Sequence, residues 1–248
     1  MDTATILQYI SKGRTDYFLE LLKKENFQEL LEVGPVKPLR WLVYYDDLTA
    51  LKLLLERGGT LDSIDLNQEL NSAAFFGHWK ICEFLINHGA DVNARLESTH
   101  ETALHSALCK AGRPYYFYTI KLLVDKGADV NAVTLPNQET DAFMRDVRTK
   151  AETPLHRAAA YADEQIISYL IEHGAKLDAK DAHGNSPISW ASEHLRPGTI
   201  LSLLSYGNHR VGEGHKAKNI SDHGQKWGNS MDWNLYGEYV LGSSSTVK

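Results

Sequence analysis

The sequence predicts an all-α fold in which copies of one helix–turn–helix unit stack into a solenoid. The first reason is a recurring frame: a Leu or Ile, small or apolar residues three and four positions later, and usually a Gly nineteen positions later. The second is that apolar residues before the Gly recur at helical spacing, as Ile81, Phe84 and Leu85 do. The third is that one such unit buries too little apolar surface to be stable alone, so neighbours must cover one another. The frame begins at Leu39, Leu70, Leu104, Leu155 and Ile188.

The units follow one another along most of the chain. A degenerate first copy starts at Ile6, lacks the expected glycine and is expected to cap the N-terminal end of the stack. In the copy that starts at Leu104 the glycine comes twenty-three residues later, so four residues have been inserted around "GRPYYFYTIK". The approximate bounds of the six units are 1–34, 35–65, 66–98, 99–148, 149–181 and 182–207.

Each unit is expected to contain a helix, a tight turn, a second helix and a stop. Small residues such as Ala73 and Ala74 allow neighbouring helices to approach closely. A glycine such as Gly89 then supplies a left-handed residue after the second helix at little steric cost.

Three segments carry a more specific signature. They are "TPLHRAAAYADEQIISYLIEHGAKLDA" at 153–179, "ETALHSAL" at 101–108 and "GHWKICEFLINHGADVNA" at 77–94. These segments resemble ankyrin repeats, and the resemblance extends over residues 3–207. It implies an L-shaped stack of antiparallel helix pairs, finger loops along one edge, and a function in binding another protein.

The resemblance also assigns roles to single residues. It implies that Thr102 and Thr153 cap the first helices of their repeats, and that His105 and His156 hydrogen-bond the backbone of a neighbouring repeat. Cys82 falls where the family has a buried aliphatic residue. The second and third repeats have "KPLR" and "QELN" where the family prefers a TPLH-like tetrapeptide, so weaker caps are expected there.

One finger is predicted to be much longer than the others. From Gly127 to Thr153 there are 26 residues, against 13 from Gly89 to Thr102. The added stretch is polar apart from Phe143 and Met144. Insertions in a solenoid often lie on the binding face, so these two residues are predicted to contact a partner.

The last positions of the first helices are where the ankyrin resemblance places partner contacts, on the inner wall of the groove. Aromatic residues gather there in the second and third repeats, and such residues dominate the energetics of interfaces. The predicted contacts at these positions are Tyr44, Tyr45, Phe75, Phe76, Lys110, Tyr161 and His194. Two alternatives stay open: Phe75 packs under the next repeat and leaves only Phe76 exposed, or the surface mediates self-association.

Residues 208–248 lie outside the frame. Their first half is polar and rich in Gly, and their second half carries several aromatic residues. We expect this segment either to fold back as a cap on the last repeat or to act as a linear docking motif.

Composition narrows the function. A net charge of −6 argues against a nucleic-acid partner, and no run of about 18 apolar residues indicates a membrane span. Two cysteines and the absence of a secretion signal favour an intracellular, cytoplasmic location. The predicted protein is a monomeric scaffold without cofactors, and a pathogen effector delivered into a host cell is an alternative with the same surface.

The sequence gives little support for a catalytic site, a metal site or a modified residue. No motif suggests a catalytic nucleophile or a phosphate loop, so no enzyme is predicted. His209, His215 and His223 leave open an enzyme or metal site in the C-terminal segment, although their spacing matches no common zinc pattern. Asn93 and Asn131 are similar to ankyrin-repeat asparagines that asparaginyl hydroxylases modify, but the same residues also suit a structural turn.

Overall fold

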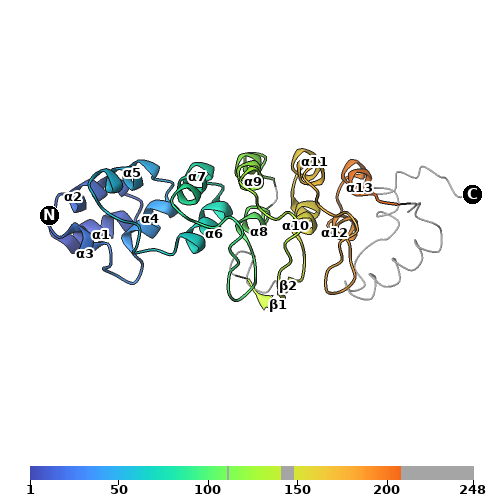
Figure 1. The fold of residues 1–248 in the computed structure, drawn as a ribbon, viewed down its shortest axis with the longest axis horizontal. Coiled ribbons are helices and arrows are strands. Elements are labelled where there is room, and N and C mark those ends of the chain that lie inside the picture. Colours follow the sequence, from blue (N-terminus) through green and yellow to red (C-terminus); the bar gives the residue numbers. More distant parts are fainter. Residues whose placement is uncertain (111, 141–147, 208–248) are drawn as a thin grey trace, which may run out of the picture.

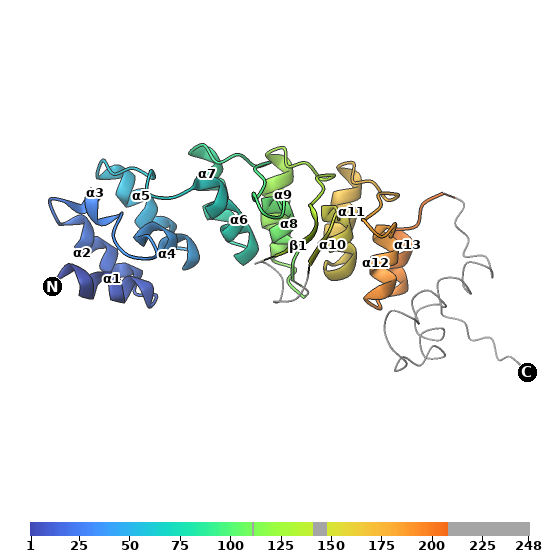
Figure 2. The ribbon, with the colours of Figure 1, turned by 90° about the horizontal axis from the view of Figure 1, so that it is seen from below.

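The described residues form an elongated, single-file stack of helix pairs (Figure 1, Figure 2). The computed structural model describes residues 1–110, 112–140 and 148–207. The predicted all-α solenoid is confirmed, with one short two-stranded sheet added to it.

The elements follow the chain in pairs. The helices are α1 (Thr3–Ser11), η1 (a 3₁₀ turn, Thr15–Tyr17), α2 (Phe18–Leu22), α3 (Phe27–Leu30), α4 (Pro38–Tyr44), α5 (Leu48–Glu56), α6 (Leu66–Phe76), α7 (Trp79–Asn87), α8 (Ala103–Ala107), α9 (Tyr116–Asp125), α10 (Pro154–Tyr161), α11 (Glu164–Glu172), α12 (Pro187–Glu193) and α13 (Gly198–Leu203). The strands are β1 (Pro136–Glu139) and β2 (Arg148–Lys150).

The helices lie in two rows (Figure 1). The inner row is α1, α4, α6, α8, α10 and α12, and the outer row is α2, α5, α7, α9, α11 and α13. Each helix contacts its partner in the other row and the next helix of its own row. Stability therefore comes from a chain of neighbour contacts, as in other solenoids.

The recurring frame corresponds to the core. Leu70, Ala73 and Ala74 of α6 have no exposed surface, and neither have Ala158 and Ala159 of α10. The small side chains allow the inner helices to pack closely, because a larger residue at these positions would push them apart. Cys82 is also fully buried, as predicted.

The predicted threonine–histidine pairs cap α8 and α10. The Thr102 hydroxyl accepts from the backbone of His105, and the backbone N–H of Thr102 donates to His105 Nδ1 over 3.2 Å. Because Nδ1 accepts, Nε2 carries the ring proton and donates to the carbonyl of Glu152 over 3.3 Å. His156 repeats the arrangement, with its Nε2 3.1 Å from the carbonyl of Asn185. These bonds confirm the predicted links between neighbouring repeats.

Asparagines join the turns that follow the outer helices. Asn93 donates to the carbonyl of Gly127 over 2.9 Å and accepts from the Asp129 N–H over 2.7 Å. Asn131 makes the same two bonds one repeat later, to Gly174 and from Lys176, both 2.9 Å. These side chains thus have a structural role in linking successive turns.

Two helix starts test the prediction of weak caps. α4 begins after Lys37, whose side chain makes no capping bond, as predicted. The prediction is wrong for α6, which begins at Leu66, before the "QELN" stretch, and is capped by Asp65. The Asp65 carboxylate accepts from the N–H groups of Asn67 and Gln68 over 2.9 and 3.2 Å. An acidic residue three positions earlier than the aligned cap position supplies the missing acceptor.

The long finger contains an antiparallel hairpin that the sequence did not predict. β1 pairs with β2 so that Pro136 lies opposite Lys150 and Glu139 opposite Arg148. The Leu135 N–H donates to the carbonyl of Thr99 over 2.8 Å, which attaches the hairpin to the preceding finger.

A buried ion cluster fixes the base of this finger. Arg157 of α10 is fully buried, and its guanidinium pairs with Glu152 and, over 2.7 Å, with Glu101. Burial disfavours the charged form of Glu152, but Arg157 and hydrogen bonds from the Lys150 N–H and the Thr134 hydroxyl outweigh it, so the pKa of this carboxyl lies below its usual range.

Candidate protein-binding surface

Five aromatic side chains, on the inner helices α4 and α6 and at the residue that follows α4, form a connected series of ring contacts. We call this set, Trp41, Tyr44, Tyr45, Phe75 and Phe76, the aromatic row. Trp41 lies 5.9 Å from Tyr44 and 6.0 Å from Tyr45, measured between ring centres. Tyr44 meets Phe76 edge-on at 4.9 Å, and Phe76 meets Phe75 at 5.1 Å.

The row is only partly covered by the rest of the described chain. Tyr44 is 46% exposed and Tyr45 is 37% exposed, while Trp41, Phe75 and Phe76 are half-buried. Phe75 and Phe76 are thus both partly accessible. An exposed aromatic patch of this kind commonly marks a site of contact with another molecule.

The backbone after α6 explains how Phe75 and Phe76 come to lie side by side. Gly77 ends the helix in a left-handed conformation with φ +80°, and an added Cβ there would lie 2.8 Å from the Tyr116 ring. The Tyr116 hydroxyl donates to the Phe75 carbonyl, one of the carbonyls left free at the end of α6. A glycine and a buried tyrosine therefore fix the end of this helix.

An apolar cavity adjoins the row at its N-terminal end. Its volume is ≈ 320 Å³, and its wall includes Leu7, Val33, Val36, Pro38 and Trp41. Trp41 therefore belongs both to the aromatic row and to the wall of this cavity. The position of the Tyr45 side chain is fixed by a hydrogen bond, because its hydroxyl donates to the Ser11 carbonyl over 2.9 Å.

Lys110 follows the row at its other end. Its Nζ lies 3.8 Å from the centre of the Phe75 ring and 5.6 Å from that of Phe76. A cation at this distance from an aromatic face is attracted by the ring quadrupole. Burial lowers the pKa of Lys110, and the positive charge of Arg113 lowers it further.

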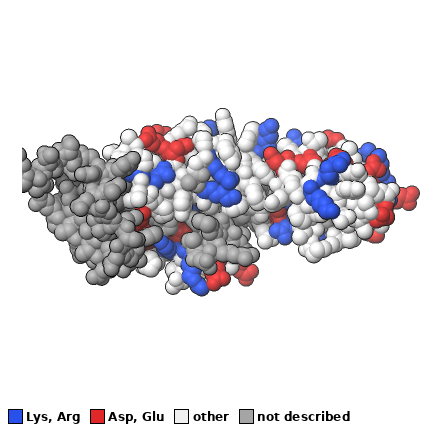
Figure 3. Space-filling view, turned by 180° about the vertical axis from the view of Figure 1, so that it is seen from behind, with Lys and Arg blue, Asp and Glu red and all other residues white. Residues whose placement is uncertain are grey.

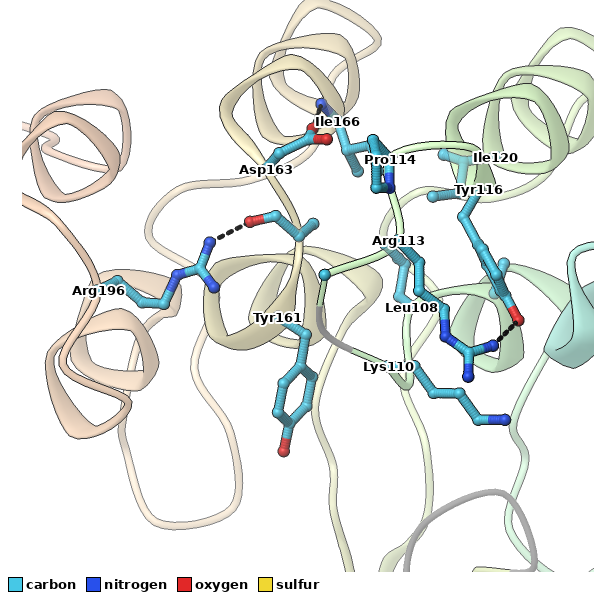
Figure 4. Close-up of a pocket in the computed structure, with 13 residues that line it drawn as sticks. Leu108, Lys110, Arg113, Pro114, Tyr116, Ile120, Tyr161, Asp163, Ile166 and Arg196 are labelled. Atoms are coloured by element: carbon cyan, nitrogen blue, oxygen red, sulfur yellow. Dashed lines mark hydrogen bonds between the residues drawn. The ribbon is translucent and has the colours of Figure 1, made fainter.

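A second cavity lies beyond Lys110, between α8 and α10 (Figure 4). We call it the basic cavity; its volume is ≈ 350 Å³ and its wall includes Leu108, Lys110, Arg113, Tyr161, Asp163 and Arg196. It forms where residues 108–115 connect the short helix α8 to α9. The connection that carries the inserted residues therefore forms part of the wall of this cavity.

The charged groups of the basic cavity differ in how they are held. Arg196 donates to the carbonyls of Ala160 and Ala162 at the end of α10, and burial lowers its pKa. Arg113 donates over 2.8 Å to the Tyr116 hydroxyl (Figure 4). Asp163 caps α11 by accepting from the Ile166 N–H over 2.9 Å. Cations outnumber carboxylates in this wall.

On the face drawn in Figure 3, uncharged side chains occupy much of the middle of the solenoid, with a group of Lys and Arg side chains among them.

The comparison with protein families decides what kind of repeat this is. A family model described as ankyrin repeats (3 copies) matches residues 39–134 and 135–212. The chain belongs to the ankyrin repeat family. Ankyrin repeats are generally protein–protein interaction modules.

Individual relatives share the repeats over part of their length. Rabankyrin-5 of Homo sapiens is 37% identical over 108 residues, which are 42% of this chain and 8% of that protein. Neurogenic locus notch homolog protein 2 of Homo sapiens is 29% identical over 187 residues, 66% of this chain and 7% of that protein. Palmitoyltransferase AKR1 of Lachancea kluyveri is 23% identical over 230 residues, 82% of this chain and 29% of that protein. This ankyrin chain therefore spans less than a third of each of these relatives.

The predicted contact residues fall into two groups on the ankyrin stack. Tyr44, Tyr45, Phe75, Phe76 and Lys110 lie together, as one row and the cation that ends it. Tyr161 and His194 form a second group across the basic cavity, with ring centres 5.1 Å apart. Phe143 and Met144 lie outside the described residues, as do the histidines and aromatic residues of the C-terminal segment.

Sequence reasoning missed three residues of this surface. Trp41 precedes Tyr44 by three positions on the same helix, and that spacing was a signal that the two share a face. Arg113 and Arg196 lie between helices, where periodicity gives no direction, so no sequence signal indicated them.

The aromatic run at 115–118 has mixed directions. Tyr116 is buried and Phe117 packs against the core, whereas Tyr115 and Tyr118 are exposed on the outer helix α9. Tyr118 is 62% exposed and contacts Trp79 of α7, away from the aromatic row.

The described residues contain neither a membrane-spanning helix nor a metal-binding cluster. No helix among them is long and apolar enough to cross a bilayer. The same residues contain no group of three or more His, Cys, Asp or Glu side chains placed to hold a metal ion.

Proposed function

We propose that this ankyrin repeat chain binds a segment of a partner protein along the aromatic row. The observation that supports this most is the continuity of the row, in which five partly exposed rings touch in series across two repeats. Each aromatic side chain can bury roughly 150–250 Å² against a partner, so the row supplies the apolar centre of an interface. Truncating such anchors typically costs about 2 kcal/mol or more in binding.

The repeats occupy residues 1–207 in this proposal, and the monomeric chain acts as an intracellular scaffold. Cys82 and Cys109 are both free and buried, which agrees with a reducing compartment. Fractionation of the source cells followed by immunoblotting checks this location.

A displayed library of random peptides tests the binding proposal without knowledge of the partner. Peptides selected on the wild-type chain are expected to carry aromatic or aliphatic residues, and to lose at least tenfold in affinity for the double variant Tyr44→Ser/Phe76→Ser. These two residues suit the test because their rings touch each other and, among the residues that the structure describes, neither side chain makes a hydrogen bond.

Tyr118→Ser is the matched control, since Tyr118 is an exposed tyrosine on the outer row. The control is expected to bind the selected peptides as the wild type does. Circular dichroism melting of all three proteins separates loss of binding from loss of fold. Equal binding by the double variant and the wild type would show that the row is not the binding surface.

A further inference from the structure

Lys110 belongs to two features at once. Its Nζ covers the Phe75 ring at the end of the aromatic row, and the same residue lines the basic cavity. A polypeptide segment that lies on the row and continues along the inner helices therefore passes over this cavity.

The basic cavity has positive charge that the described chain leaves uncompensated. Lys110, Arg113 and Arg196 line it together with one carboxylate, that of Asp163. That carboxylate is held by the N-terminus of α11, and Arg196 is held by the end of α10. Within residues 1–110, 112–140 and 148–207, no ion pair is formed by Lys110 or Arg113.

We infer that the basic cavity binds the carboxylate of an Asp or Glu in the partner segment held by the aromatic row. This inference rests on the proposed function and adds the chemistry of the partner to it. Arg113 and Lys110 supply the donors: the guanidinium uses one N–H on Tyr116 and keeps the others for a ligand, and the Lys110 ammonium lies on the same side of the loop (Figure 4).

The geometry also sets the spacing between the acid and the apolar anchors of the partner. One to two helix spacings of about 8–10 Å separate the end of α6 from the gap between α8 and α10. An extended chain advances about 3.3 Å per residue. The acidic residue is therefore expected roughly three to six residues from the residue that contacts Phe76.

A carboxylate suits this cavity better than a phosphate group does. Asp163 is part of the wall, and a phosphate with a charge of about −2 would bring more negative charge beside it than a single carboxylate would. A segment with an unmodified acidic residue is thus the occupant that the charges favour.

A double-mutant cycle, in which the peptide and the protein are each varied, tests the inference. Peptides are selected from a displayed library of random 16-residue sequences on the wild-type chain, and the best is synthesised with its acidic residue intact, as the Asn or Gln isostere, and as phosphoserine. Each form is titrated against the wild type and against Lys110→Met/Arg113→Gln. Methionine keeps an apolar cover on Phe75, and glutamine keeps a donor for the Tyr116 hydroxyl.

We expect the isostere to bind the wild type about tenfold more weakly than the acidic peptide, and both to bind the double variant equally. Lys80→Met is the control, because Lys80 also lies over an aromatic ring, 5.5 Å from the centre of Trp79, but on the outer row. It should leave the acidic preference unchanged.

The outcomes separate this inference from the proposed function. Selected peptides that depend on Tyr44 and Phe76 but bind equally well as acid and isostere would overturn the inference alone. A phosphoserine form that binds tighter than the carboxylate would overturn it too, in favour of a phosphate site. Peptides that bind the Tyr44→Ser/Phe76→Ser variant as tightly as the wild type would overturn the proposed function, and the inference with it.

Discussion

Arg157 and Glu101 form an ion pair 2.7 Å long in which the two side chains are 0% and 1% exposed. The pair joins α10 to the finger before α8, and the same guanidinium reaches Glu152 and the His105 carbonyl. A buried cation shared between two carboxylates stabilises only while it is complete, because removing one partner leaves charge without compensation in the interior.

Replacing this arginine should therefore be costly. Arg157→Met is expected to lower the free energy of unfolding by about 3–5 kcal/mol, since it strands Glu101 and Glu152. Urea unfolding followed by circular dichroism measures it. Arg148→Met is the control, because Arg148 pairs with Glu139 at the surface and its loss should cost about 0–1 kcal/mol. Equal effects of the two changes would contradict the structural role given to Arg157.

Acid is expected to destabilise the stack in two stages. Burial and then the charge of Arg157 lower the pKa of His105 to about 3, from an ordinary value of 6.5, and burial lowers that of His156. A histidine whose pKa is lower in the folded state gives stability that is complete above about pH 6.5 and is lost as the pH falls toward the folded value. The lowered pKa of Glu152 adds a further loss below its ordinary value of 4.5.

Urea midpoints measured from pH 8 to pH 4 check this dependence. Stability should be flat from pH 8 to about pH 7 and should fall below it. A His105→Gln variant should show a smaller fall between pH 7 and pH 5, even though it is less stable throughout. An unchanged midpoint between pH 7 and pH 4 in the wild type would contradict the prediction.

Gly77 is expected to tolerate no side chain. Gly77→Ala places a Cβ 2.8 Å from the Tyr116 ring in a left-handed conformation, whereas Gly174→Ala has the same kind of backbone with φ +90° and open space around it. Both changes carry a conformational cost of about 1–2 kcal/mol, and only the first adds a clash. Gly77→Ala should thus melt at a clearly lower temperature than Gly174→Ala. Identical melting temperatures would show that Tyr116 moves aside freely.

The asparagine links between turns should be measurable in the same way. Asn131→Ala removes one donor and one acceptor that join two successive turns, and should lower the free energy of unfolding by about 1–3 kcal/mol. Asn87→Ala is the control, since the Asn87 side chain makes one long hydrogen bond within the described residues, 3.4 Å from Lys126. A small effect of Asn131→Ala, similar to that of the control, would mean that water replaces these bonds.

The helical repeats were predictable because the residue type at a buried position recurs from one repeat to the next. A position such as Leu70 or Ala158 has the same neighbours in every unit, so its residue type recurs wherever the unit recurs. The start of α6 was not predictable in this way, because Asp65 caps the helix from outside the aligned tetrapeptide. The hairpin of the long finger was also missed, since its strands are polar and short and follow no alternation.

The binding surface was predictable to the extent that it lies on helices. Positions at the ends of α4 and α6 have a direction fixed by the buried residues before them, and Tyr44 and Phe76 lie side by side as that direction requires. Arg113 lies in a connection whose length is visible in the sequence but whose path is not. The basic cavity depends on that path, so only the structure revealed it.

The cluster around Arg157 has a consequence for how the stack comes apart. The helix α8 is only five residues long, and the joint between it and α10 includes the buried ion pairs of Arg157 with Glu101 and Glu152. Protonation of the groups around Arg157 would weaken the contact between α8 and α10 before the other contacts between repeats. The solenoid would then unfold first in its middle and not at its two ends. Hydrogen exchange at mildly acidic pH should accordingly accelerate first at α8 and at the base of the hairpin.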